Sequence, residues 1–218
     1  MKTRYLICCV VSVLTISKLL IGPGYTIAPY DKNWPVLFSK EHEALERVLG
    51  PLAQKIEHIG STSVPGLSAK PIIDIIITIN NKMDARQVVE RLQKYGYVFK
   101  GAHKVQKDTP WYWGLWLSFH KNSNKGTRLY QIHLVENNSP IYHDYIALRD
   151  YMRRHPDDAQ KYAELKKSLK KIKKQRYEYR QGKGPFLDSI LPKAQKEYYA
   201  PIFAEYRITE YNDQWPLP

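Results

Sequence analysis

The sequence predicts an α+β domain in which a mixed sheet is flanked by helices, with extra helices at the C-terminal end. Apolar runs of strand type, interrupted by one helical segment, occupy residues 55–136, and helical spacing dominates from residue 139 onward. The composition, 43% hydrophobic and 25% charged, is that of a folded domain, and 218 residues can bury one substantial core. We therefore expect a domain over residues 29–195, preceded by an extension (1–28) and followed by a tail (196–218).

The first predicted element is a helix within residues 30–50. Asn33 can cap it, Pro35 suits its first turn, and Gly50 ends it. Its apolar stripe consists of Leu37, Phe38, Leu45 and Val48.

Two strands follow, in residues 55–59 and 71–79. The second, PIIDIIITI, is β-branched and almost wholly apolar, which is typical of a central strand covered on both faces. A helix is then predicted in residues 84–96, with Asp84 as its cap and Gly96 as its stop. Three more strands are expected in residues 97–103, 113–121 and 128–136.

Helices are predicted in residues 139–155, 156–177 and near 185–203. The first two have proline at the first helical position. In the second, an apolar face should pack on the core and leave the lysines exposed; that face consists of Tyr162, Leu165, Leu169 and Ile172.

Positive charge is concentrated near the C-terminal end. The formal net charge is +13, and Lys161 to Lys183 holds ten Lys or Arg against Glu164 and Glu178. Such a run favours an anionic partner, whether nucleic acid, nucleotide or membrane surface. It is also typical of a solvated helix face, and both interpretations stay open.

The N-terminal segment is apolar and contains both cysteines, Cys8 and Cys9. Because no cysteine follows, no disulfide framework or cysteine-based zinc site is expected in the domain. Lys2 and Arg4 precede a run of signal-peptide length, too short to cross a bilayer and without a clear cleavage site. We expect a cytoplasmic protein without a transmembrane span; the alternatives are an upstream start codon, export, or membrane association through residues 1–28.

The segment IEHIGSTSVPGLSAKPIIDI (56–75) is the strongest local candidate for a binding site. Gly60 and Gly66 permit positive φ, and the hydroxyls and amides of Ser61, Thr62 and Ser63 can form an anion-binding turn. Asp74, on the following strand, can hold a hard cation that bridges to a bound phosphate. A plain turn between two strands, with a hydrogen-bonded aspartate, is the competing interpretation.

This segment, together with YDKNWPVLF upstream and IHLVE…LRDYMRRHPDDAQKYAELKKSL…YRQGKGPF downstream, resembles the GrpB family. The resemblance covers residues 27–195. That family is similar to the domain appended to some dephospho-CoA kinases and belongs to the nucleotidyltransferase-fold superfamily. The resemblance therefore implies a nucleotidyltransferase-like mixed sheet. It implies a fold more firmly than a reaction, because the biochemical activity of the family is poorly defined.

Within that superfamily, Gly60 and Ser61 match the turn that binds nucleotide phosphates, and Asp74 matches the first of two carboxylates that hold Mg²⁺. Ile76 stands where active enzymes have the second acid, so two-metal catalysis is in doubt while binding can survive. His133 matches the second histidine of a His-Leu-His-Val-like stretch in the family, and Gln131 stands in place of the first. We expect His133 to face the same pocket as Asp74. It is a candidate metal ligand, general base or phosphate donor, and equally a hydrogen-bonded, partly buried histidine.

Further candidates are basic or aromatic. Lys70 and Arg128 can neutralise phosphate, and Tyr179 with Lys183 matches a family Tyr-x-x-x-Lys stretch. His58 resembles a family histidine or packs under the loop. An aromatic cluster, formed by Trp111, Tyr112, Trp113 and Trp116, suits stacking on a base as well as a core or an interface.

Three functions remain open. The first is Mg²⁺-dependent nucleotidyl transfer with Asp74 and His133 as catalytic residues. The second is a module that binds a nucleotide or another phosphorylated small molecule without transfer. The third is a basic, non-enzymatic protein that contacts nucleic acid or anionic lipid through Lys161–Lys183.

Overall fold

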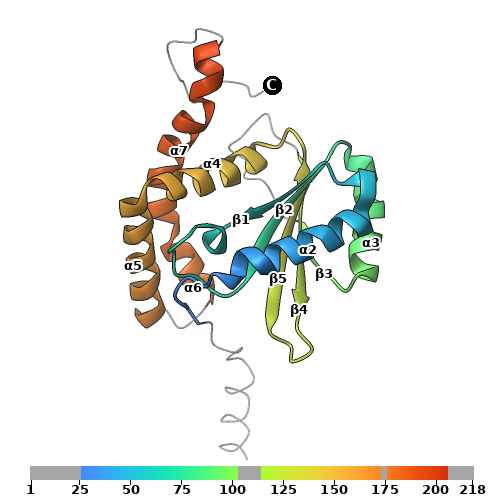
Figure 1. Cartoon of the computed structure of the whole chain (residues 1–218), viewed down its shortest axis with the longest axis horizontal. Helices are drawn as coiled ribbons and strands as arrows, with labels where there is room; N and C mark the ends of the chain where they lie inside the picture. Colours follow the sequence, from blue (N-terminus) through green and yellow to red (C-terminus); the bar gives the residue numbers. More distant parts are fainter. Residues whose placement is uncertain (1–25, 103–113, 173–175, 206–218) are drawn as a thin grey trace, which may run out of the picture.

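The computed structural model describes residues 26–102, 114–172 and 176–205 (Figure 1). The strands are β1 (Lys55–Ile59), β2 (Ile73–Ile79), β3 (Val98–Ala102), β4 (Trp116–Asn122) and β5 (Arg128–Glu136). The helices are α2 (Asn33–Leu49), α3 (Ala85–Lys94), α4 (Pro140–Arg154), α5 (Pro156–Ile172), α6 (Arg176–Gly182) and α7 (Gly184–Glu205). Short 3-10 turns are η1 (Gly50–Leu52), η2 (Ser61–Ser63) and η3 (Lys82–Asp84).

The five strands form one mixed sheet in the order β1-β2-β5-β4-β3. β2 and β5 are parallel, and the other neighbouring pairs are antiparallel. The predicted mixed sheet is therefore confirmed, and β2 lies between two partners, as its apolar sequence requires.

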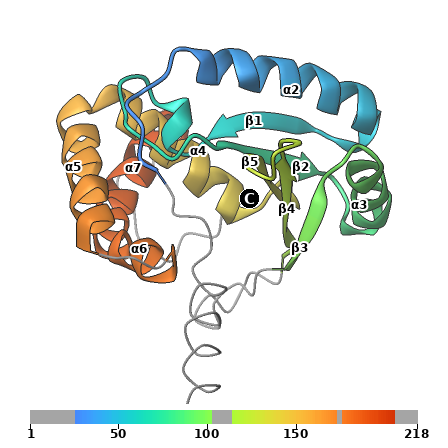
Figure 2. The same cartoon turned by 90° about the horizontal axis from the view of Figure 1, so that it is seen from below.

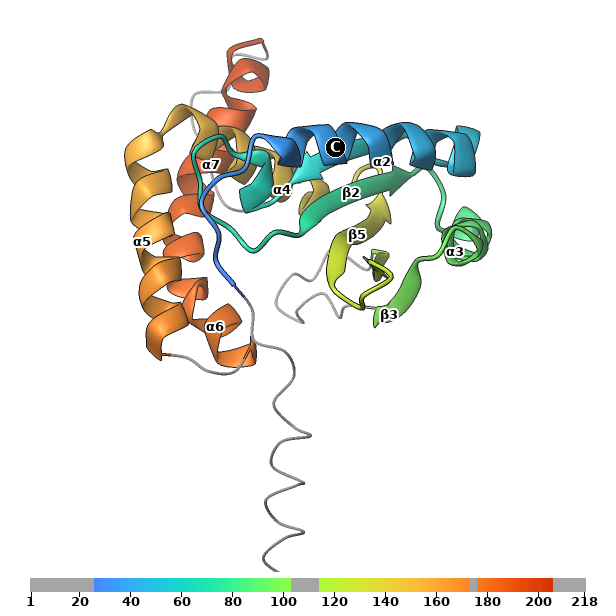
Figure 3. The same cartoon turned by 60° about the horizontal axis from the view of Figure 1, so that its bottom comes forward.

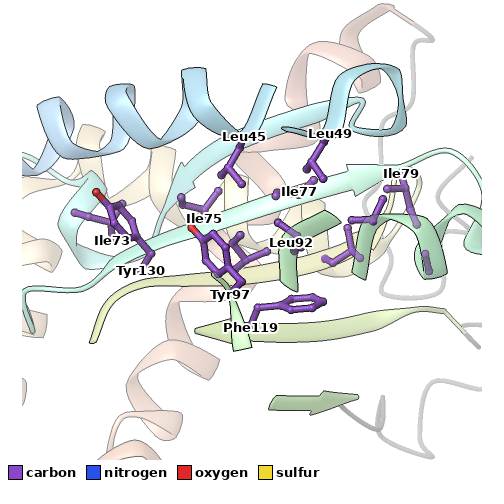
Figure 4. Close-up of a cluster of buried hydrophobic side chains, with 14 of the residues drawn as sticks. Leu45, Leu49, Ile73, Ile75, Ile77, Ile79, Leu92, Tyr97, Phe119 and Tyr130 are labelled. Carbon is purple, nitrogen blue, oxygen red and sulfur yellow. The ribbon is translucent and has the colours of Figure 1, made fainter. Parts of the chain in front are cut away.

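Helices cover both faces of the sheet. On one face, Leu45 and Leu49 of α2 point toward Ile75 and Ile77 of β2 in the main core (Figure 4), to which Leu92 of α3 also belongs. Strand alternation turns the neighbouring side chains to the other face, which α4 covers. There Ile59, Ile76 and Val135 of the sheet pack with Tyr142 and Ile146 of α4.

The C-terminal helices form a second packing unit at one end of the sheet. α5 and α6 lie on the side opposite α3 (Figure 2), next to the end of the sheet where β2 begins (Figure 3). An apolar cluster at this end joins the loop between β1 and β2 to α4, α5 and α7 through Val64, Leu67, Tyr151, Tyr162 and Ala194. These helices therefore hold the loop that the sequence marked as a candidate site.

The buried face of α5 differs from the predicted one. Ile172 is 71% exposed, whereas Lys166 is only 2% exposed. The buried positions are Ala159, Tyr162, Ala163 and Lys166, which follow helical spacing on a face toward the β1–β2 loop. The expectation that this helix exposes its lysines is therefore wrong at Lys166.

One helix cap was predicted wrongly, and a second is at the predicted residue but lacks its side-chain hydrogen bond. Asn33 does not cap α2; its backbone N–H instead donates to Asp31 Oδ1 at 2.8 Å. Asp84 is the N-cap residue of α3, as predicted, but its side chain makes no capping hydrogen bond. Asn81 caps the preceding turn η3 by accepting from the N–H of Met83. Along the predicted α2 stripe, Leu37 is 40% exposed, and the buried positions are Trp34, Glu41, Leu45 and Leu49.

The glycine stops are confirmed. Gly50 follows α2 with φ +56°, and Gly96 follows α3 with φ +96°. Within the described ranges, no helix combines the length and hydropathy needed to cross a membrane.

Candidate functional site

The turn that follows β1 brings Gly60 against Asp74. Ile59, the last residue of β1, pairs with Asp74 of β2, and Gly60 then turns with φ +71° into η2. A Cβ on Gly60 would lie 2.7 Å from Asp74 Oδ2 and 3.2 Å from Asp74 Cβ. Only glycine combines this backbone conformation with this approach, so the turn and the carboxylate are built as one unit.

Two of the three hydroxyls in this turn are used to hold its shape. Ser63 Oγ donates to the carbonyl of Gly60 at 2.6 Å, and Thr62 Oγ1 donates to the carbonyl of Ile72 at 3.2 Å. His58 Nε2 lies 3.0 Å from Thr62 Oγ1, which therefore accepts its proton. Burial, together with Arg153 and Arg149, lowers the pKa of His58 to about 4, so this histidine is neutral and supports the loop.

Arginines of α4 hold the same loop from outside. Arg153 donates from Nε and Nη2 to the carbonyl of Ser63, at 3.1 and 2.9 Å. Arg149 donates to the carbonyl of His58 at 3.2 Å and pairs with Glu57 at 2.8 Å. The loop is thus fixed by α4 before any ligand binds, and Glu57 is ion-paired.

A small cavity opens beside this turn. Its volume is about 80 Å³, and its walls come from η2, the loop before β2, β2 itself, α5, α6 and the turn between α6 and α7. The lining residues are Ser61, Thr62, Ala69, Lys70, Asp74, Lys166, Tyr179 and Lys183. Six candidates named from the sequence therefore line one cavity: Ser61, Thr62, Lys70, Asp74, Tyr179 and Lys183.

Lys166 is a cavity residue that the sequence did not single out. Its Nζ donates to the carbonyl of Ser68 and lies 3.0 Å from Ser61 Oγ. Burial lowers its pKa to about 7, and the nearby charge of Lys183 acts in the same direction. The run of charged residues around it gave no signal of burial, because lysine is seldom buried.

Burial and neighbouring charges act in opposite directions on the pKa values of Asp74 and Lys183. Burial raises the pKa of Asp74 to about 6, although Lys183, Arg128 and Lys70 each act to lower it. Burial also lowers the pKa of Lys183, against the attraction of Asp74. The amines of Lys70 and Lys183 lie 4.3 and 5.3 Å from the centre of the Tyr179 ring, so Tyr179 contacts both cations.

His133 lies on the same face of the sheet as Asp74 but outside the cavity lining. Asp74 pairs with Gln131 and Ile76 pairs with His133 in the parallel β2–β5 register. His133 Nδ1 accepts from Trp116 Nε1 at 3.1 Å, and its Nε2 lies 3.0 Å from Gln131 Nε2. Its lone pair at Nδ1 is thus engaged, and its catalytic role stays a prediction.

Arg128 and Ser63 also lie beside the cavity rather than in its lining. Arg128 begins β5, donates to Gln131 Oε1 at 3.4 Å, and acts on Asp74 through its charge. Ser63 is buried within the turn. Of the aromatic cluster, Trp111, Tyr112 and Trp113 lie outside the described residues, while Trp116 contacts His133.

The donor set does not fit a magnesium site built by the protein alone. Ile76, which the resemblance implied stands where active enzymes have a second acid, is fully buried in the core beneath α4. The described parts of the chain contain no group of three His, Cys, Asp or Glu side chains placed to hold a metal. Asp74 offers one carboxylate beside three lysines, so a Mg²⁺ ion here would depend on ligand phosphates and water for its other ligands.

Comparison with known proteins identifies the family of the chain. The family model described as GrpB protein matches residues 25–193. The UPF0157 protein YqkA of Bacillus subtilis is 34% identical over 72% of this chain, which spans 43% of that protein's length. The crystal structure of conserved protein GrpB from Enterococcus faecalis has 28% identity, covers 80% of this chain and 99% of that one, and has a TM-score of 0.67.

More distant matches bear on the fold. The solved GLD-2/RNP-8 complex aligns over 87% of this chain and 75% of that one, with 13% identity and a TM-score of 0.50. This likeness supports the nucleotidyltransferase-like fold alone. A dephospho-CoA kinase of Mycolicibacterium paratuberculosis is 35% identical over 33% of this chain and 18% of that protein, which agrees with the predicted resemblance to a kinase-appended domain.

Proposed function

The chain belongs to the GrpB protein family, and from that premise we propose that its cavity binds the phosphate group of a small molecule. The proposal rests on one observation: the cavity is lined by Ser61, Lys70, Lys166 and Lys183. Three lysines and a hydroxyl are donors for phosphate oxygens, and they outnumber the single carboxylate of Asp74.

The size of the cavity supports a single phosphate group as the enclosed part of the ligand. Its volume is about 80 Å³, and one water needs roughly 10–15 Å³ on the same measure. Pockets that enclose whole drug-sized ligands are roughly 300–1,000 Å³. The rest of a nucleotide or phosphorylated metabolite would therefore extend out of the cavity.

Asp74 gives the site a second property. With a pKa of about 6, its carboxyl changes charge in the range where a phosphate monoester changes from monoanion to dianion. A protonated Asp74 would donate a hydrogen bond to the phosphate, and an ionised Asp74 would repel it. Binding is therefore expected to weaken as the pH rises from about 5 to about 7, unless a cation lies between the two anions.

Mg²⁺-dependent nucleotidyl transfer is the finer version of this proposal. It needs Asp74 to bind the metal together with phosphate oxygens, since Ile76 supplies no ligand. The third candidate, contact of Lys161–Lys183 with nucleic acid or anionic lipid, is weakened because Lys166 and Lys183 line the cavity instead of a surface.

A thermal-shift panel separates these functions. Nucleotides, inorganic phosphate and coenzyme-A-type compounds are each tested with and without Mg²⁺. A ligand at about a hundred times its Kd should stabilise the fold by roughly 2.7 kcal/mol. Lys183→Gln should reduce the stabilisation by phosphate compounds. Lys167→Gln, a control at the exposed residue next to Lys166, should retain it. This pair of results supports the phosphate site.

The Mg²⁺ arms decide the finer proposal. Stabilisation that requires Mg²⁺ and is lost in Asp74→Asn supports metal-assisted binding, and formation of a labelled product from a nucleoside triphosphate supports transfer. If no phosphate compound stabilises the protein while DNA or anionic vesicles bind with a steep salt dependence, the third function is preferred.

A further inference from the structure

Ser61 and Lys166 form a hydrogen-bonded pair at the wall of the cavity. Lys166 Nζ donates one hydrogen bond to the carbonyl of Ser68 and lies 3.0 Å from Ser61 Oγ. In the structure this hydrogen bond runs from Lys166 Nζ to Ser61 Oγ, and Ser61 also shares a side-chain hydrogen bond with Tyr162. In its neutral form the amine has a lone pair, so the direction reverses when the Ser61 hydroxyl donates its proton to Nζ. The arrangement of a nucleophile, a base within hydrogen-bond reach and a third group that orients the base is that of an activated hydroxyl.

The other two hydroxyls of the turn lack this arrangement. Thr62 Oγ1 donates to the carbonyl of Ile72, and Ser63 Oγ donates to the carbonyl of Gly60. A carbonyl accepts a hydrogen bond but does not remove the proton at neutral pH. Among the three, Ser61 alone combines a place in the cavity lining with an amine partner.

We propose that Ser61 is a nucleophile for phosphoryl groups and that Lys166 is the base that takes its proton. This proposal rests on the proposed function, because the cavity must first hold the phosphate. The substrate class is an activated phosphate monoester or a phosphoanhydride.

Phosphoryl transfer to Ser61 exchanges one bond at phosphorus for another. Ser61 Oγ forms a bond to phosphorus, the bond from phosphorus to the bridging oxygen breaks, and that oxygen leaves with the electron pair. The hydroxyl proton moves to Lys166 Nζ. The product is phosphoserine at position 61, which water or an acceptor hydroxyl then attacks to release the phosphoryl group.

The environment of Lys166 suits this role. Its pKa of about 7 leaves a large neutral fraction at neutral pH, so the base is available without a strong activating partner. Its amine lies 4.5 Å from the centre of the Tyr162 ring. The charged or titratable groups that share its surroundings are Lys70, Asp74, Tyr162, Tyr179 and Lys183.

The neighbours supply what a phosphoryl transfer needs besides a base. Lys70 and Lys183 can neutralise the non-bridging oxygens, which carry the charge in the transition state. Asp74 has a pKa of about 6, and in its protonated form it can donate its proton to the leaving oxygen. None of these groups is an alternative nucleophile of the hydroxyl type.

p-Nitrophenyl phosphate tests the proposal with the full chain. Its phosphate fits the cavity while the aryl group extends out, and nitrophenolate release is followed by absorbance. We expect a burst of at most one nitrophenolate per protein and phosphoserine at residue 61 by peptide mass spectrometry. At p-nitrophenyl phosphate concentrations that saturate the cavity at each pH, the weaker binding expected from ionised Asp74 does not affect the burst rate. The burst rate should then rise as the pH increases from about 6 to about 8, because Lys166 loses its proton.

Matched variants and a competitor identify the groups involved. Ser61→Ala should abolish the burst, and Ser168→Ala on the exposed side of α5 should retain it. Lys166→Met should slow the burst at least 100-fold, the lower bound for general-base assistance, and Lys167→Met should not. Circular dichroism establishes that each variant is folded, and the wild-type pH profile tests the base without any substitution.

The outcomes separate this proposal from the proposed function. Labelling of Ser61 that inorganic phosphate does not slow supports the nucleophile and contradicts the phosphate pocket. No labelling of Ser61, in a protein that inorganic phosphate still stabilises against heat, overturns the nucleophile and leaves the pocket standing. A burst rate that does not change from pH 6 to 8 overturns the role of Lys166.

Discussion

Replacing Gly60 with alanine tests the contact between the turn and Asp74. Gly60 has φ +71°, and a Cβ there would meet Asp74 Oδ2 at 2.7 Å and Asp74 Cβ at 3.2 Å. Rotating the carboxylate relieves only the first contact, since the Asp74 Cβ is fixed to strand β2. The β1–β2 pairing, in which Ile59 lies opposite Asp74, must therefore shift.

The expected loss combines two effects. A non-glycine residue in the left-handed region costs roughly 1–2 kcal/mol, and overpacking costs roughly 1–3 kcal/mol more. Gly66 is a matched control, because it has φ +79° in the same loop, while a Cβ added there would meet no other described part of the chain within 4 Å. Gly66→Ala should therefore show the first loss alone.

Urea unfolding of the two variants gives the difference. We expect Gly66→Ala to lower the unfolding free energy by about 1–2 kcal/mol, or roughly 2–8 °C in Tm for a chain of this size. Gly60→Ala should lose at least about 1 kcal/mol more and bind phosphate compounds less well. Equal losses in the two variants would refute the claim that the turn and Asp74 form one unit.

Substitutions at three further positions test other parts of the same geometry. Ile76→Asp introduces a carboxylate at the position where the resemblance implied a second acid. It should lower the unfolding free energy by about 3–5 kcal/mol because an unpaired charge enters the core. Ile76→Val should cost only about 0.5–1.5 kcal/mol in the same urea experiment, and equal effects of the two variants would contradict the packing. The pKa of Asp74 is raised from its ordinary value to about 6, so the folded state binds the extra proton and the unfolding free energy should fall as the pH rises from about 4 to about 6. In Asp74→Asn the unfolding free energy should lack this fall. The same dependence of unfolding free energy on pH in the variant and the wild type would contradict the prediction. Arg153→Met removes two hydrogen bonds to the Ser63 carbonyl. Amide hydrogen exchange in the loop between β1 and β2 should therefore become faster, while β5 stays protected. Unchanged exchange in that loop would contradict the role of Arg153 in fixing it.

The sheet and most helices could be predicted because their signals are local. An apolar β-branched run gives β2, and proline at the first helical position marks α4 and α5. Asn33 does not cap α2, and Asp84 lacks a capping hydrogen bond. Several nearby residues can accept the same backbone N–H, and the choice depends on how the chain enters the helix.

The candidate site was only partly predictable. Gly60, Ser61 and Asp74 are close in sequence, and the resemblance described from the sequence implied their roles. Lys166 lies 105 residues from Ser61, and its burial depends on the packing of α5 against the loop. Within a run of lysines, periodicity alone does not tell which one turns inward.

The central claim is that the cavity beside Gly60 holds a phosphate group, and ³¹P transverse relaxation of inorganic phosphate measures this most directly. Phosphate in exchange with the wild-type protein, and with the Lys167→Gln control, should relax faster than free phosphate. Lys183→Gln, folded by circular dichroism, should lose most of this enhancement. Equal enhancement by Lys183→Gln and the wild type, or none by any of the three proteins, would contradict the account.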